Sequence, residues 1–327
     1  MLTPPDNRSL LSAFLGDGRF PLVLTGAALV FSGAFAIFQS ITGHFLPHDV
    51  AELGMDAQHL ERAVNRNLVL FMFHDRVAFG GTLIAIGAAY GWLAEFPLRQ
   101  GMAWAWRAFA FSGAAGFLSF LAYIGYGYLD TWHGVATLVL LPLFLTGLLR
   151  SRRLIVPAPV PVAAAGKERL ARALLAFDAW SLLAAGCVIL FVGMTRVFVP
   201  QDLSFIAVPE TRLRDVSPVL VPLIAHDRAG FGGGLLCTGI LLLQMTRCAA
   251  LTRNFTQIVA VMGLAGFGAA IGVHHAVGYR DFLHLLPAYA GAAIFCAALI
   301  LLVFAYREKC QWEIISETMP SPKTSNA

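Results

Sequence analysis

One eight-residue phrase that combines ionisable and small residues occurs twice in the sequence. HDRVAFGG runs from His74 to Gly81, and HDRAGFGG runs from His226 to Gly233. Each phrase places an imidazole, a carboxylate and a guanidinium inside an otherwise apolar stretch. Because burying such groups among apolar residues is costly, the two phrases are the first candidates for a functional site.

A second repeated motif adds a histidine to each half of the chain. GYLDTWH begins at Gly127, and GYRDFLH begins at Gly278. In each motif the aspartate and the histidine are three residues apart, so on a helix they share one face. Nitrogen and oxygen ligands of this kind suit zinc or iron. The candidate metal ligands are therefore His74, Asp130, His133, His226, Asp281 and His284.

The composition predicts an all-α integral membrane protein. Only 13% of the 327 residues are charged and 58% are hydrophobic, whereas a soluble domain carries about 25% charged residues. The lipid bilayer is thus an expected partner. Nucleic acid is not, because the net charge is only +4 and no basic patch with interleaved aromatic residues is present.

Eight apolar runs are long enough to cross a bilayer, which takes about 20 residues. They cover residues 19–40, 66–94, 102–126, 131–150, 171–199, 218–246, 255–278 and 282–306. We therefore predict a short tail (1–18), a four-helix unit (19–150), a linker (151–170), a second four-helix unit (171–306) and a polar, disordered tail (307–327).

Basic residues predict how the chain crosses the membrane. Lys and Arg gather in the linker and beside both termini, and cytoplasmic segments are enriched in these residues. We therefore expect both termini in the cytoplasm and a multi-pass protein of the inner (plasma) membrane. The longer connections near residues 41–65 and 200–217 then lie outside.

The two units resemble each other. FLPHDV at Phe45 recurs as FVPQDL at Phe198, and the repeated motifs are offset by 153, 152 and 151 residues. Since each unit has four helices, both units enter the membrane in the same direction, which is a parallel repeat. We expect two tandem four-helix bundles, in which the FxPxD motifs supply turns and helix caps and His48 is a solvated loop residue.

Within each predicted bundle, one histidine lies on the second helix and one on the fourth, at similar depth. This spacing predicts the pairs His74 with His133, and His226 with His284. Facing helices of a bundle can direct such a pair at one centre.

This arrangement resembles the heme A synthase family. The resemblance covers residues 19–306 and consists of the eight helices, the parallel units and the four histidines near the outer face. It implies that each histidine pair ligates a heme. Phe71 and Leu223 stand where that family has a glutamate, so hydroxylation of the heme is not implied.

Two further sets of residues each have two interpretations. Arg76 and Arg228 either hold heme propionates or pair with aspartates across helices. Small residues four and seven positions after each HDR histidine either form a flat slot for a macrocycle or let helices pack closely. These positions are Ala78, Gly81, Gly230 and Gly233.

The main hypothesis is a membrane heme-binding protein or oxidoreductase with bis-histidine sites near the outer face. A quinone or another redox partner would then exchange electrons with it. The alternatives are a non-heme zinc or iron enzyme that uses the His and Asp clusters, and a transporter or structural bundle without a cofactor.

Overall fold

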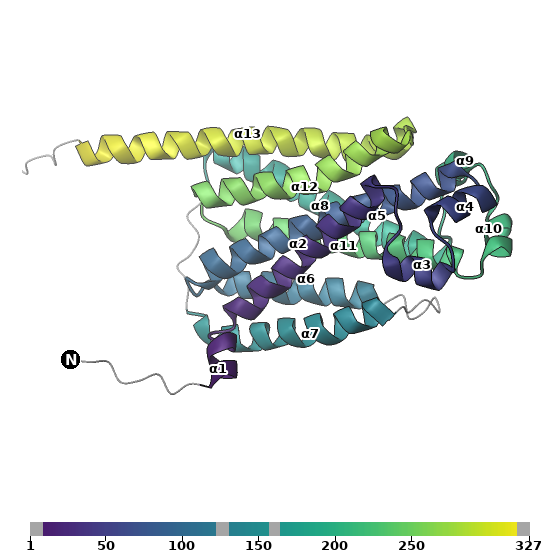
Figure 1. Cartoon of the computed structure of the whole chain (residues 1–327). Helices are drawn as coiled ribbons and strands as arrows, with labels where there is room; N and C mark the ends of the chain where they lie inside the picture. The colour runs from purple at the N-terminus through teal and green to yellow at the C-terminus, as the bar shows by residue number, and fades with distance from the viewer. Residues whose placement is uncertain (1–8, 122–130, 157–163, 319–327) are drawn as a thin grey trace, which may run out of the picture.

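The computed structural model describes residues 9–121, 131–156 and 164–318, and most of these residues are helical (Figure 1). Seven of the described helices are long and apolar enough to cross a membrane. The chain is therefore an all-α, multi-pass membrane protein. The seven are α2 (Arg19–Ile41), α5 (Arg66–Leu93), α7 (Thr131–Ser151), α8 (Gly166–Thr195), α11 (Leu220–Cys248), α12 (Arg253–Val277) and α13 (Phe282–Thr318).

These seven helices correspond to seven of the eight predicted spans. The remaining predicted span falls on α6 (Ala103–Leu121), which is followed by residues outside the described part of the chain. Two short irregular turns extend the long helices, η1 (Ala94–Leu98) after α5 and η3 (Arg152–Leu154) after α7.

The predicted outer connections fold into short helices. They are α3 (Pro47–Leu53), α4 (Ala57–Ala63), α9 (Pro200–Ile206) and α10 (Glu210–Val216), and they gather at one end of the molecule, opposite α1 (Leu10–Leu15) (Figure 1). The FxPxD prolines begin α3 and α9. The predicted capping role is confirmed for Asp202, whose Oδ2 accepts a hydrogen bond from the Val199 amide at 2.8 Å.

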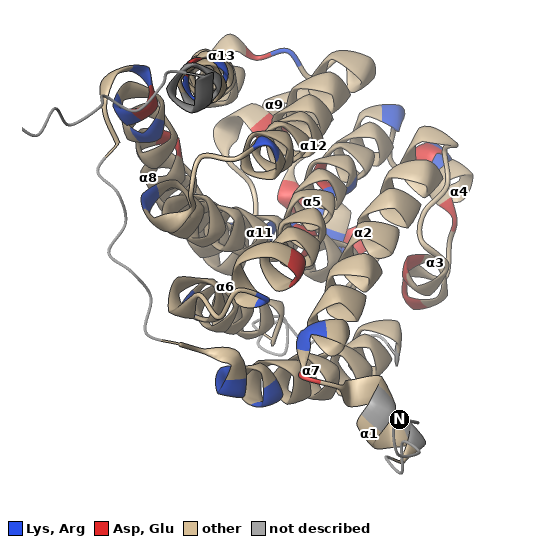
Figure 2. Ribbon diagram, turned by 90° about the vertical axis from the view of Figure 1, so that its left-hand side faces the viewer, with Lys and Arg blue, Asp and Glu red and all other residues tan. Residues whose placement is uncertain are grey.

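Helices α5 and α11 form the centre of the bundle (Figure 2). The most apolar segments of these two helices are 72% and 67% buried, against 11–28% for the other five spans. Helix α5 packs against α2, α12 and α11, and α11 packs against α8, α6 and α5. Because each central helix contacts helices from both halves of the sequence, the described helices do not divide into one separate bundle per unit.

The prediction of a disordered tail from residue 307 is wrong for its first part. Helix α13 continues to Thr318 and projects beyond the rest of the bundle (Figure 1). Two contacts hold the extension, an ion pair between Glu308 and Lys167 and a hydrogen bond from Lys309 Nζ to the Leu251 carbonyl at 3.2 Å. Polar helix formers therefore extend the last span past its apolar part.

Glycines allow α2 and α5 to cross with their backbones in contact. A Cβ atom added to Gly26 would lie 2.7 Å from the Gly87 carbonyl oxygen, and one added to Gly80 would lie 2.8 Å from the Gly33 carbonyl oxygen. No side chain fits at either distance. Small residues serve this purpose widely in membrane helices, where close packing replaces the hydrophobic effect.

The Gly87→Ala substitution should therefore destabilise the protein, because its methyl group would overlap the α2 backbone. We expect a loss of about 1–3 kcal/mol, typical of overpacking, measured by thermal unfolding in detergent. Gly91→Ala is the matched control. Gly91 lies one turn further along the same helix, and a Cβ atom added there would have nothing within 4 Å. Equal stability of the two variants would contradict the close crossing.

Candidate metal centre and neighbouring cavity

The two HDR phrases exchange ion pairs across the centre of the bundle. Arg76 Nε lies 3.2 Å from Asp227 Oδ2, and Arg228 Nε lies 3.3 Å from Asp75 Oδ2. All four side chains are buried. The structure thus places these arginines in pairs with aspartates across helices, the second of the two roles considered for them.

Each arginine also contacts a second carboxylate from an outer FxPxD motif. Arg76 Nη2 lies 2.8 Å from Asp49 Oδ2, and Arg228 Nη1 lies 2.7 Å from Asp202 Oδ2. The sequence analysis predicted turns and helix caps for these motifs and no contact with the arginines. The signal that could have indicated the contact is that the acid recurs together with the HDR phrase, at offsets of 153 and 152 residues.

This reciprocal core carries an excess of negative charge. Its four carboxylates meet two guanidinium groups, which leaves a formal charge of −2. Buried ion pairs are stable only when their charges are compensated. An imidazole lies against each half of this core, with His74 Nδ1 3.1 Å from Asp75 Oδ1 and His226 Nδ1 3.4 Å from Asp227 Oδ1.

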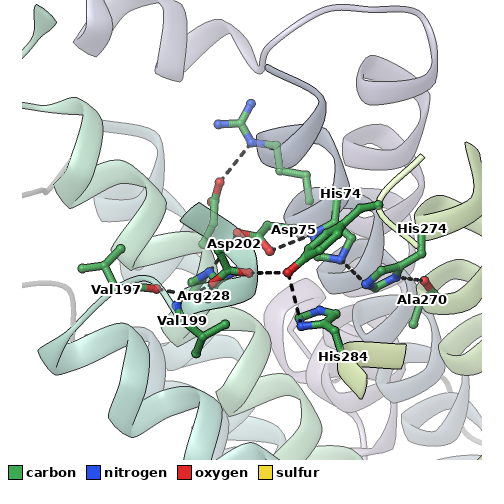
Figure 3. A network of polar contacts seen from close by, with 12 residues as sticks. His74, Asp75, Val197, Val199, Asp202, Arg228, Ala270, His274 and His284 are labelled. Carbon is green, nitrogen blue, oxygen red and sulfur yellow. Dashed lines mark hydrogen bonds and ion pairs between the residues drawn. The ribbon is translucent and has the colours of Figure 1, made fainter. Parts of the chain in front are cut away.

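Three histidines from three helices meet beside one half of this core (Figure 3). His74 on α5, His274 on α12 and His284 on α13 each present a ring nitrogen, and the three nitrogens lie within 4.8 Å of one another. His74 and His274 are buried, and His284 is half-buried. Such a group can hold a metal ion.

Second contacts determine which ring nitrogens face the centre. His274 Nδ1 donates a hydrogen bond to the Ala270 carbonyl at 2.6 Å. The contact of His74 Nδ1 with Asp75 is electrostatic rather than a well-aligned hydrogen bond. The Nε2 atom of His274 therefore keeps its lone pair, and it lies 2.9 Å from His74 Nε2, which is a hydrogen-bond distance between the two rings.

Tyr279 links the third histidine to the charged core. Its ring stacks on the His284 ring at 4.6 Å between centroids. Its hydroxyl donates to Asp202 Oδ1 at 2.9 Å and lies 3.4 Å from His284 Nδ1. Through Asp202, which also binds Arg228, the position of His284 depends on the same ion pairs as that of His74.

The histidines of the other half lie at the end of a large cavity. The His133 and His226 ring centroids are 4.5 Å apart, and the His48 centroid is 4.9 Å from that of His133. All three line a mostly apolar cavity of about 500 Å³ between α2, α5, α6, α7 and α11. His48 is therefore part of a cavity wall and not a solvated loop residue as predicted.

The predicted pairing of histidines within each unit is wrong. The structure pairs His74 with His284 and His226 with His133, so each pair joins the two units. The physical reason is the interleaving of the helices, since α5 packs on α12 and α11 packs on α6. His274 was missed as a member of the cluster because it has no equivalent in the other half.

The two aspartates of the GYxDxxH motifs have different outcomes. Asp281 is exposed and its Oδ1 accepts a hydrogen bond from the His284 amide at 2.7 Å. It therefore caps the start of α13 rather than joining the three histidines, which corrects its prediction as a metal ligand. Asp130 lies outside the described residues.

The small residues after each HDR histidine lie at close contacts or beside the cavity. A Cβ on Gly81 would lie 2.5 Å from the Ala265 carbonyl oxygen, and one on Gly233 would overlap the Ser119 side chain. These two glycines permit close packing, and Ala78 is buried in the same way. Gly230 lines the cavity next to His226.

Comparisons of the chain with protein-family models, with curated proteins and with solved structures found no match.

The Arg228→Gln variant should lose about 3–5 kcal/mol of stability, the usual effect of leaving buried carboxylates without their cation. The measurement is thermal unfolding of the purified protein in detergent. Arg214→Gln is the control, because its ion pair with Glu210 is exposed and is worth only about 0.3–0.5 kcal/mol. Similar losses for the two variants would contradict a stabilising core.

Proposed function

We propose that this chain is a membrane metalloprotein that binds one transition-metal ion through His74, His274 and His284. The observation that carries the proposal is the convergence of three imidazoles from three helices on one point. Two of them have the opposite ring nitrogen against a carboxylate or a carbonyl. Ligating histidines typically have such partners, which fix the ring and its tautomer.

The surrounding charge supports a cation at this point. The Nε2 atoms of His74 and His274 lie 2.9 Å apart and share one proton in a hydrogen bond, and a metal ion can take the place of that proton. The formal charge of −2 on the adjacent ion-pair core favours a divalent ion over a single proton. Three imidazoles suit zinc or iron and leave a coordination position open for water or a substrate.

A heme is the less well supported alternative. Two imidazoles that ligate one iron from opposite sides, each nitrogen about 2 Å from the metal, have ligating nitrogens about 4 Å apart and ring centroids farther apart still. The centroids of His133 and His226 are 4.5 Å apart, so no porphyrin fits between these rings. The ring centroids of His74 and His284 are 6.3 Å apart. The His274 centroid lies 4.1 Å from that of His74 and 5.2 Å from that of His284, so a third ring stands beside this pair.

We further propose that both termini are cytoplasmic and that the metal centre lies near the outer face of the plasma membrane. Figure 2 looks onto the end of the molecule where the N-terminus lies, and Lys and Arg gather there on α7 and α8. Cytoplasmic ends are enriched in these residues. The centre lies toward the opposite end, about 12 Å along α5 from its first residue at 1.5 Å per residue.

Inductively coupled plasma mass spectrometry of the purified protein should find about one zinc or iron ion per chain. His274→Gln should weaken metal binding at least about 10-fold, because a ligand is lost. His275→Gln is the matched control, since that exposed neighbour contacts Tyr289 instead. Failure of the wild type to bind Zn²⁺, Fe²⁺ or Co²⁺, or equal binding by both variants, would refute the centre, and a Soret band would favour heme.

Replacing Asp75 by Asn should lower the metal affinity about 10–100-fold, because the carboxylate beside a ligating imidazole raises its basicity. Asp227→Asn removes the equivalent carboxylate and breaks the equivalent ion pair with Arg76, yet it does not contact His74. Competition with a chelator of known affinity measures both variants. If the two variants lose the same metal affinity, Asp75 acts through the stability of the fold and not through the His74 imidazole.

A further inference from the structure

The cavity next to the second pair of histidines is a site of its own. It has a volume of about 500 Å³, and none of the three proposed metal ligands lines it. Its size falls in the range of pockets that bind small molecules, about 300–1,000 Å³. Three features determine what it can bind: the charged groups and imidazoles at one end, the shape, and the side on which it opens.

The charged side chains and the imidazoles lie at one end of the cavity, near the start of α5. His226 and Asp227 enter from α11, His133 from α7 and Arg76 from α5. His226, Asp227 and Arg76 are each at least nine-tenths buried. Because the carboxylates of Asp227 and Asp49 surround Arg76, an anionic ligand such as a fatty acid is disfavoured. Imidazoles both donate and accept hydrogen bonds, which suits a neutral head group with carbonyl or hydroxyl oxygens.

The cavity is elongated. On α5 its lining runs from Arg76 to Tyr90, which is about 21 Å at 1.5 Å per residue. This length suits a ring followed by a hydrocarbon chain that lies along the helices.

The cavity borders the surface that faces lipid. Phe35 on α2 and Trp132 on α7 both line it, and they are 47% and 64% exposed. The backbones of these two helices approach closely at Gly18 and Gly147, toward the other end of the bundle. A lipid-soluble molecule can therefore enter between the outer parts of α2 and α7.

We infer that this cavity binds an isoprenoid quinone or its quinol. The head group lies at His133 and His226, where the Phe120 ring is 5.3 Å from His133 and 6.5 Å from His226 between centroids. The tail lies along α5 toward Tyr90. This inference is independent of the metal proposed above, because the two sites share no ligand.

The test is to measure ubiquinone-2, a quinone with two isoprene units, bound to purified protein in lipid nanodiscs. Quinone that co-purifies is extracted and quantified in the same samples. Ala136→Phe fills the cavity from α7. Val135→Phe is the matched control, because the neighbouring residue is 48% exposed and does not line the cavity. Metal content is recorded for both variants.

We expect about one quinone per wild-type chain, at least a 10-fold weaker affinity for Ala136→Phe, and no change for Val135→Phe. Metal content should stay constant in both, so loss of one site is distinguished from loss of the other. Absence of quinone binding by the wild type would overturn the inference. Equal binding by the two variants, or heme that co-purifies in place of quinone, would do the same.

Discussion

The reciprocal ion pairs between α5 and α11 are the constraint on which the rest of the structure depends. Two arginines and four aspartates are buried where apolar helices meet. Each HDR phrase needs the other, since the arginine of one phrase contacts the aspartate of the other. Because a buried charge that loses its partner costs several kcal/mol, this core fixes the relative position of the two central helices and joins the outer helices α3 and α9 to them.

The same carboxylates also position the imidazoles. Asp75 contacts both Arg228 and His74, and Asp202 contacts both Arg228 and Tyr279. A single network therefore ties His74 and, through Tyr279, His284 to the core, and its excess negative charge favours a cation at the centre. In the other half, Asp227 is placed between Arg76 and His226 in the same manner, but there the imidazoles face a cavity. The arrangement around Asp75 thus supports the proposed metal site, and the related arrangement around Asp227 supports the proposed site for a neutral amphiphile.

Much of the fold could be predicted from the sequence, and much of the site could not. Hydropathy indicated seven spans that the structure also has, because apolar length is a local property. The repeated motifs located His74, His226, His133 and His284, but local patterns do not determine which helices pack together, so the pairs were assigned within units. His274 lacks a counterpart in the first half, so the repeated motifs did not indicate it. The role of Asp49 and Asp202 was hidden because a helix cap already explained their spacing.

X-ray absorption at the metal edge of the purified protein tests the central claim most directly. The proposed centre predicts scattering from three imidazole rings, with metal–nitrogen distances of about 2.0–2.1 Å, and the loss of one ring in the His284→Gln variant. A spectrum without imidazole scattering, or one that the His284→Gln substitution leaves unchanged, would contradict a metal ion held by histidines from both halves of the chain.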